Sequence, residues 1–325
     1  ESQMGIPIEE QKLLSNGKLL SDDNLSESVQ LIISLEGGAK GKKKKQTQKK
    51  TKKKHVVPGF GLSMGIVIAM LSVIILIPLA SVLGYSFQLK PAEFFKIVTD
   101  PFVLWAFLTS ILTAFLAAVI NVVFGTILAW VLVRYEFPGK RFIDGLIEVP
   151  FTLPTAVAGI TLSKMYSTTG ELGGPLSKLG IEVSYTHLGL IVALVFIGIP
   201  FVVRAIQPVL EKFDYQYEEA AYMLGASPRK TFIKVILPEL RPAMITGFGL
   251  AFARGIGEYG SVIYISGNSA KEHTQVVSYI IMQKLERLDY SGATAIALIM
   301  LIISFLLLLF INIVQVRQSR RTNNI

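Results

Sequence analysis

Two charged residues inside an apolar segment are the first candidates for chemistry in this sequence. Arg254 and Glu258 stand four residues apart in FARGIGEYGS, a spacing that places both on the same face of a helix. An unpaired charge at the centre of a membrane is costly, so such residues face the interior of a helix bundle and find partners. The pair is therefore either a structural ion pair, or a functional pair in which Arg254 supplies positive potential to a polar path and Glu258 restrains Arg254.

Two prolines interrupt a second apolar segment, PFTLPTAVAG at 150–159. Each proline removes a backbone N–H and disturbs the helical ladder, so the freed carbonyls must face protein or water rather than lipid. The segment is either a kinked structural helix or an irregular backbone that lines a polar path. In the second interpretation the candidate lining residues are Thr152, Pro154, Thr155 and Gly159.

Other kinds of site are not expected. The sequence has no cysteine, which excludes structural disulfides and thiolate metal sites, and its three histidines, His55, His187 and His273, lie far apart. No nucleophile–base set and no G-x-x-x-x-G-K-[ST] phosphate loop occurs. We therefore expect no catalytic residue, metal or cofactor, and no ATP hydrolysis by the chain itself.

The elements that position these residues are long apolar segments. Apolar residues make up 51% of the 325 positions, and they are unevenly distributed. A hydrocarbon core of ~30 Å needs ~20 apolar residues in one helix. The sequence therefore predicts an all-α membrane protein with six spans, at roughly 62–85, 106–133, 145–165, 188–208, 243–265 and 292–316.

Positive charge predicts the orientation of these spans. Ten lysines lie between Lys40 and Lys54, more than the whole net charge of +9. Such a run can bind nucleic acid, but in a membrane protein it is typical of a solvated cytoplasmic flank, and we expect no nucleic-acid partner. Alternate loops carry fewer Lys and Arg, which predicts that both termini are cytosolic.

In the fifth span Ala243, Gly247, Ala251 and Gly255 form a stripe of small residues that predicts close helix packing.

A polar segment at 208–242 separates the fourth and fifth spans. Its acidic residues at 218 and 219 suit the first turn of a short helix, and Gly225 is a typical C-terminal stop. Ser227-Pro228 is typical of the start of a second helix, which we expect to end near Pro238. The sequence thus predicts two short helices at right angles, projecting below the membrane.

This segment resembles a known motif. Glu219-Ala220-Ala221, Gly225 and Leu237-Pro238 match the pattern EAA-x3-G-x9-I-x-L-P of the permeases of binding-protein-dependent ABC importers, with Val235 in place of the usual Ile. The resemblance implies a type I importer architecture. It also implies that the segment is a coupling helix seated in a groove of an ATP-binding subunit, with the alanines allowing close docking and Gly225 forming the elbow.

The wider sequence, from about Val56 onward, resembles the T-type permease of sulfate/thiosulfate importers, on VPGFGLSMG, RYEFPGKRFIDGLIEVPFTLPTAVAGITL, IPFVVRAIQPVLE and FARGIGEYGSVIYISGN. The resemblance implies a second permease subunit, ATP-binding subunits, an external anion-binding protein and sulfate, in a bacterial inner membrane or a plastid envelope. Molybdate/tungstate permeases share the motif, and a non-ABC anion channel or secondary transporter remains an alternative. Glu148 and Glu258 are not expected to bind sulfate, because a buried carboxylate repels a dianion.

The front of the chain resembles something else. Residues 5–38 resemble the latter half of ubiquitin, and the lysine-rich stretch after them resembles the start of the ribosomal protein made as its fusion. This indicates either a chimera or a real fusion cleaved after Gly38, and the first residue, Glu rather than Met, indicates a fragment. So short a piece cannot bury a core, so we expect it to be frayed, with a hairpin at Asn16-Gly17.

The expected division is a ubiquitin-like fragment 1–38, a linker 39–55, a first span with an external amphipathic segment 56–105, a permease core 106–316 with the loop 208–242, and a tail 317–325.

Overall fold

The computed structural model describes residues 11–15, 18–19, 30–33 and 60–322. It divides into two compact units, Glu1–Gly61 and Leu62–Ile325. The lysine run at 40–54 lies outside the described residues.

The first unit contains a small antiparallel sheet of β1 (Gln11–Ser15), β2 (Lys18–Leu19) and β3 (Gln30–Ile33), in the order β2-β1-β3. Ser15 pairs with Lys18, so the hairpin predicted around residues 16–17 is present, although those two residues lie outside the described ones. The sequence did not predict that β3 would pair with β1. The resemblance of this unit to ubiquitin stays a prediction.

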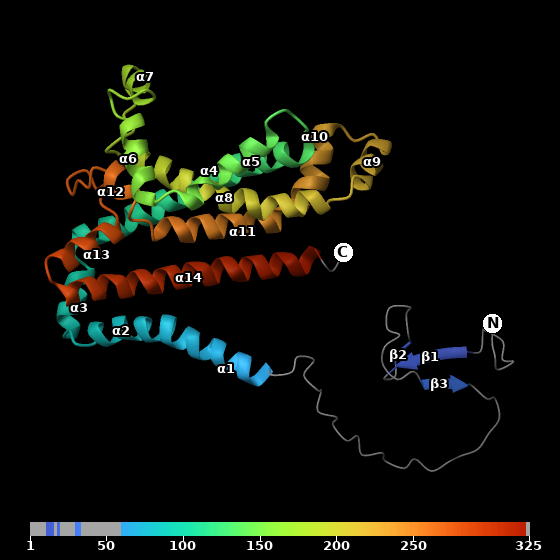
Figure 1. The fold of residues 1–325 in the computed structure, drawn as a ribbon, viewed down its shortest axis with the longest axis horizontal. Helices are drawn as coiled ribbons and strands as arrows, with labels where there is room; N and C mark the ends of the chain where they lie inside the picture. Colours follow the sequence, from blue (N-terminus) through green and yellow to red (C-terminus); the bar gives the residue numbers. More distant parts are fainter. Residues whose placement is uncertain (1–10, 16–17, 20–29, 34–59, 323–325) are drawn as a thin grey trace, which may run out of the picture. The chain divides into compact units, whose positions relative to one another are not determined.

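The second unit is a bundle of helices (Figure 1). In chain order the helices are α1 (Phe60–Leu71), the π-helical segment η2 (Ser72–Leu76), α2 (Ile77–Ser86), α3 (Pro91–Val98), α4 (Pro101–Arg134), α5 (Lys140–Thr152), α6 (Thr155–Met165), α7 (Gly173–Lys178), α8 (His187–Lys212), α9 (Gln216–Met223), α10 (Pro228–Thr231), the π-helical segment η3 (Phe232–Ile236), α11 (Leu237–Ile256), α12 (Val262–Ile265), α13 (Val277–Glu286) and α14 (Tyr290–Thr322).

Within residues 60–322, five helical stretches are long and apolar enough to cross a membrane: Gly61–Ser86, Pro101–Arg134, His187–Lys212, Pro228–Ile256 and Tyr290–Arg317. A sixth span exists only if α5 and α6 count as one, and these two helices are bent by 112°. Five of the six predicted spans are thus present as long apolar helical stretches, and the predicted third span corresponds to the bent pair α5 and α6.

Proline explains the break between α5 and α6. Leu153 is extended, with φ −81° and ψ 129°, because the ring of Pro154 disfavours a helical conformation in the residue before it. Pro154 itself stands at the N-cap of α6, where its missing N–H leaves no bond unmade. Pro150, in contrast, stays inside α5. The disturbance predicted from the two prolines is therefore concentrated at the second one.

The fifth span differs from its predicted bounds of 243–265. The helix that begins at Pro228 does not end near Pro238 but continues through η3 into α11. The N–H of Leu237 donates to the carbonyl of Phe232, five residues earlier. This wider, π-helical turn accommodates Pro238, which has no N–H to donate, without ending the helix. At its other end α11 stops at Ile256, so Glu258 lies beyond the helix.

The core lies where α4, α8 and α11 pack together, and the stripe of small residues allows the close approach. A Cβ added at Gly247 would lie 2.8 Å from the Cα of Val202 in α8, and one at Gly255 would lie 3.3 Å from the Cβ of Ala114 in α4. Ala243 and Ala251 are buried. The predicted packing role of the stripe is confirmed. The apolar faces of α1, α2 and α14 are largely exposed, as lipid-facing helices require.

Candidate functional site

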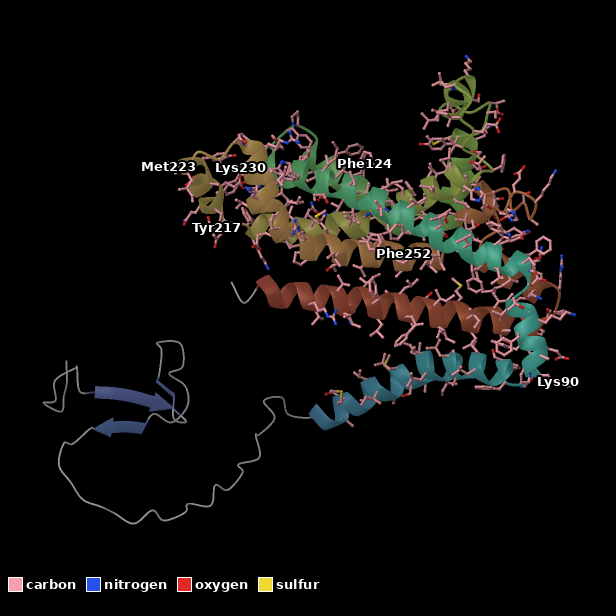
Figure 2. The ribbon with its side chains drawn as sticks, turned by 180° about the vertical axis from the view of Figure 1, so that it is seen from behind. Lys90, Phe124, Tyr217, Met223, Lys230 and Phe252 are labelled. Atoms are coloured by element: carbon pink, nitrogen blue, oxygen red, sulfur yellow. The ribbon has the colours of Figure 1, made fainter. Side chains whose placement is uncertain are left out.

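The loop between α8 and α11 leaves the bundle at one end. In Figure 1 α9 and α10 lie at the same end as the start of α1 and the end of α14, and α7, α12 and α13 lie at the opposite end. Figure 2 shows Tyr217, Met223 and Lys230 at this protruding end. The loop is therefore placed where a second protein can reach it.

Backbone geometry fixes the bend in this loop. Gly225 has φ +76°, a left-handed conformation that only glycine adopts without strain. The N–H of Gly225 donates to the carbonyl of Tyr222, and that of Ala226 donates to the carbonyl of Ala221, which together close α9 in a Schellman motif. Ser227 then caps α10, accepting from the N–H of Lys230. The predicted stop at Gly225 and the start at Ser227-Pro228 are both confirmed.

The tip of the loop exposes apolar side chains. Met223 is 89% and Leu224 88% exposed, and Tyr217 and Tyr222 are also exposed. Side chains of this kind are enriched at protein interfaces and gain most from being covered. Beside them, Glu219 and Ala220 are exposed and Ala221 is half-buried. The tip has the composition of a docking surface.

The motif residues do not all lie together. Glu219, Ala220, Ala221 and Gly225 belong to α9 and its elbow, whereas Leu237-Pro238 begins α11, beyond α10 and η3. Leu237 and Pro238 are half-buried.

Sequence reasoning missed the residue that fastens this loop to the bundle. Arg134, the last residue of α4, pairs with Glu218 of α9, with 2.5 Å between Nη2 and Oε1. Its guanidinium also lies over the ring of Tyr215, with 4.1 Å from Cζ to the ring centroid. In the sequence Arg134 counted only as a cytoplasmic charge at the end of a span. Nothing in a sequence pattern links it to a partner 84 positions away.

The second set of predicted residues lies where the membrane part of α11 ends. Arg254 and Glu258 form an ion pair of 2.5 Å, which is compatible with both interpretations of these residues. The side chain of Glu258 is 2% exposed, and its Oε1 also accepts hydrogen bonds from the backbone N–H and the hydroxyl of Ser261. The side chain of Arg254 is 37% exposed. Glu258 thus holds both the arginine and the turn that leads to α12.

The broken span packs on this same turn. A Cβ added at Gly159 in α6 would collide with the carbonyl oxygen of Ser261, and one at Gly260 would collide with the hydroxyl of Thr155. The structure therefore brings Thr155, Gly159 and the Glu258 turn together. Thr152 and Pro154 are exposed, and the hydroxyl of Thr152 donates to the carbonyl of Val149 within its own helix.

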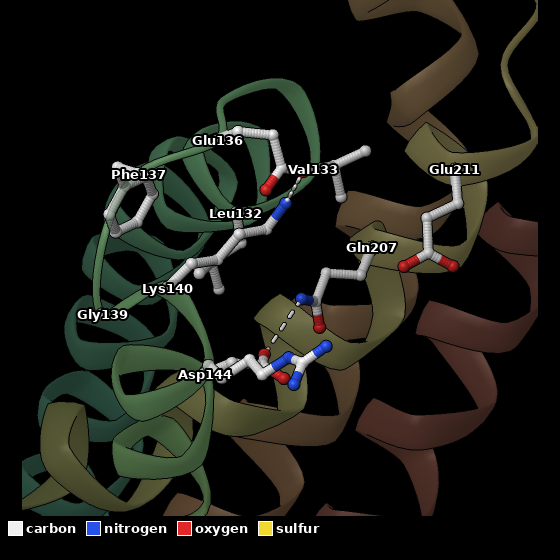
Figure 3. A pocket seen from close by; sticks show the side chains of 10 residues that line it. Leu132, Val133, Glu136, Phe137, Gly139, Lys140, Asp144, Gln207 and Glu211 are labelled. Carbon is white, nitrogen blue, oxygen red and sulfur yellow. Dashed lines mark hydrogen bonds and ion pairs between the residues drawn. The ribbon is translucent and has the colours of Figure 1, made fainter.

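A third polar cluster lies at the loop end of the bundle, beside a cavity of about 700 Å³ between the α4–α5 connection and α8 (Figure 3). Arg204 of α8 pairs with Asp144 at 2.8 Å and with Glu148 at 2.6 Å, both on α5. Gln207 donates to Asp144, as the dashed line in Figure 3 marks. Glu148 is thus paired with Arg204. The sequence offered no signal for this pairing, because α6 and α7 lie between the two helices in the chain.

Comparison with known proteins assigns the chain to one family. Residues 121–324 match the family described as the binding-protein-dependent transport system inner membrane component. The chain is 46% identical to the sulfate transport system permease protein CysT of Escherichia coli (strain K12) over 268 residues, which cover 82% of this chain and 96% of that protein. It is 48% identical to the probable sulfate transport system permease protein cysT of Nephroselmis olivacea, covering 74% of this chain and 84% of that protein.

The fold is similar to that of a solved transporter. A chain in the crystal structure of a bacterial ABC transporter involved in the import of the acidic polysaccharide alginate superposes with a TM-score of 0.67 at 16% identity, covering 80% of this chain and 96% of that one. The predicted fold class, a type I ABC importer permease, is confirmed. The chain belongs to the family of binding-protein-dependent transport system inner membrane components.

Proposed function

We propose that this chain is the membrane-spanning permease subunit of an ATP-driven, binding-protein-dependent importer for sulfate. The observation that carries the proposal is the similarity, at 46% identity over nearly the whole of the permease part, to a sulfate transport system permease. The apolar tip around Met223 and Leu224 supports the ATP-driven mechanism, because it gives a motor subunit a surface to hold.

The partners follow from the family and from the chemistry that the chain lacks. ATP is hydrolysed by separate ATP-binding subunits, which seat Glu219, Ala220 and Ala221 in a groove. Gly225 acts as the elbow, and Leu237-Pro238 leads back into the membrane. A second permease subunit completes the pore, and an external anion-binding protein delivers sulfate. Both termini and the loop lie on the cytosolic side, an orientation that the loop charges support.

The anion path runs beside the broken span and the end of α11. Sulfate carries two charges, and removing its water without new partners is prohibitively costly, so it crosses in a wet cavity lined with polar groups. The half-exposed guanidinium of Arg254 supplies positive potential there, and Glu258 orients it. Thr152, Pro154 and Thr155 form the facing wall, and Gly159 lies behind them, where it lets α6 pack closely on the backbone of Ser261.

The test is transport by the complete complex in proteoliposomes with ATP enclosed on the loop side. We expect labelled sulfate to accumulate only with ATP and the binding protein, and thiosulfate to compete better than molybdate. Uptake that proceeds without ATP would indicate a channel or an ion-coupled transporter. Stronger competition by molybdate would reassign the substrate and leave the mechanism in place.

A further inference from the structure

Arg134 is buried although it is charged. Its side chain is 6% exposed and that of its partner Glu218 15%, so both ions of the pair have left most of their water. Removing one partner of a buried pair leaves an uncompensated charge and is strongly destabilising. A pair of this kind fixes the geometry of the two elements that it joins, here the end of α4 and the first turn of α9.

Three aromatic rings surround the guanidinium. Its Cζ lies 4.1 Å from the centroid of Tyr215, 5.2 Å from Trp130 and 5.7 Å from Phe213. The Nε and Nη1 atoms are buried without a hydrogen-bond acceptor, and the ring faces stabilise the charge instead. Arginine suits this site because a planar guanidinium can stack and donate at the same time.

The rings come from segments that are separate in the chain. Trp130 belongs to α4, Phe213 and Tyr215 follow α8, and Glu218 belongs to α9. Trp130 also packs edge-on against Phe232 of η3, with 5.3 Å between ring centroids. Both ends of the loop are thus fastened to the last turn of α4 at a single cluster, which we name the Arg134 clamp (Arg134, Glu218, Trp130, Phe213 and Tyr215).

Two adjacent acids have opposite surroundings. Glu218 is turned into the clamp, whereas Glu219 is exposed on the outer side of α9. The family motif begins at Glu219, so the clamp residue lies one position outside it. One acid is therefore available to a partner and the other is committed to the chain's own bundle.

We infer that Arg134 is a positioning residue that transmits the movement of α9 to α4 during ATP-driven transport; this inference rests on the proposed function. The helix α4 spans Pro101–Arg134 and packs on both α8 and α11, so it carries a displacement at its end into the core. Without the clamp, α9 would rotate about the flanking segments near Asp214 and Gly225. The movement of the ATP-binding subunits would then displace α9 without displacing α4. ATP would then be hydrolysed without import.

The test is the amount of sulfate imported per ATP hydrolysed by the complete complex in proteoliposomes. For Arg134→Gln and Glu218→Gln we expect this ratio to fall by about five-fold or more, the lower end of typical allosteric coupling factors, while ATP hydrolysis continues. Arg134→Lys should restore only part of the ratio, because lysine keeps the charge without stacking. The exchanged pair Arg134→Glu with Glu218→Arg should recover more than either of its single changes.

The matched control is Glu136→Gln, which breaks the exposed ion pair with Lys140 and should leave the ratio unchanged. Unchanged ratios in Arg134→Gln and Glu218→Gln, in complexes assembled at the wild-type level, would overturn the inference. If these two variants fail to assemble, Arg134→Lys, which keeps the charge of the pair, decides the question, because a wild-type ratio in that variant would also overturn the inference. A wild-type complex that hydrolyses ATP but imports no sulfate would count against the proposed function instead, so the two failures are distinguishable.

Discussion

The charged residues that join separate helices or turns of the bundle are each held by a specific partner. The pair Arg254–Glu258 was predictable from its spacing of four positions, although Glu258 lies in the turn just after the end of α11 and not on the helix itself. The pairs Arg134–Glu218 and Arg204–Asp144 were not predictable, because their partners come from different helices. A sequence pattern reports neighbours along a helix, whereas contacts between helices require the fold.

The Glu258 turn gives the first prediction. Glu258→Gln removes the charge that compensates Arg254 and should lower the thermal midpoint of the purified complex, because the buried carboxylate also holds Ser261. Adding Arg254→Gln removes the orphaned charge and should recover part of the loss. If the double variant is less stable than the single one, Glu258 does not act through Arg254.

Asp289 gives a second prediction, on pH dependence. Its Oδ2 accepts from Lys284 at 2.8 Å, and this bond holds the pKa of the carboxyl below its ordinary value of 3.8. A lowered pKa means that the charged form stabilises the fold, so the contribution is complete above pH 3.8 and is lost as pH falls through the folded-state pKa. Asp289→Asn should remove this acid-dependent part of stability, measured by thermal unfolding across the pH range.

Asp289→Ala serves as the companion variant. Oδ1 of Asp289 also accepts from the N–H of Gly292 and caps α14, a role that asparagine can keep and alanine cannot. Alanine should therefore cost about 1 kcal/mol at neutral pH, more than asparagine does. Equal losses in the two variants would show that the cap contributes nothing.

At the scale of elements, the length of the apolar segments predicted the spans, but the prolines did not show which helices would break. Pro154 disturbs its span as predicted. Pro238 does not end its helix, because the π-helical turn before it accommodates a residue without an N–H. The sequence alone does not show whether a helix breaks at a proline or continues past it through a π-helical turn. The loop motif gave its local geometry correctly, since Gly225 and Ser227 act on neighbouring residues only.

Gly225 gives the third prediction. A Cβ there would have nothing within 4 Å, so any effect of substitution comes from the positive φ rather than from crowding. Gly225→Pro should abolish ATP-coupled uptake while the protein stays in the membrane, because proline fixes φ near −65°. Gly225→Asn should retain most of the activity, since asparagine tolerates the left-handed conformation.

Gly145→Ala is the control, because that helical glycine also has open space and no positive φ. Gly159→Ala, in contrast, places a methyl group against the backbone of Ser261 and should reduce assembly or uptake. Full uptake by Gly225→Pro would show that the bend of the loop is dispensable.

At the scale of the whole molecule, the start of α1, the loop and the end of α14 lie at the same end of the bundle, and α7 lies at the other end (Figure 1). In the proposed function, the end with the loop faces the ATP-binding subunits and the end with α7 faces the binding protein that delivers the anion. Because the sequence has no cysteine, single cysteines can report this arrangement without background labelling.

The fourth prediction concerns sidedness. Leu179→Cys beside α7 should react with a membrane-impermeant maleimide added outside intact bacterial cells, and Met223→Cys should react only after the membrane is opened. Both side chains are exposed, so accessibility within the bundle does not limit either reaction. Labelling of both from the same side would contradict the proposed topology.

The most direct test of the account is a cross-link from the tip of the loop. In the complete complex, Met223→Cys should cross-link to the ATP-binding subunit through a short bifunctional reagent, and the cross-link should stop sulfate uptake. Leu179→Cys, at the other end, should give no such product. A complex that imports sulfate with ATP, yet forms no cross-link from Met223→Cys or Leu224→Cys, would show that the motor acts elsewhere on this chain.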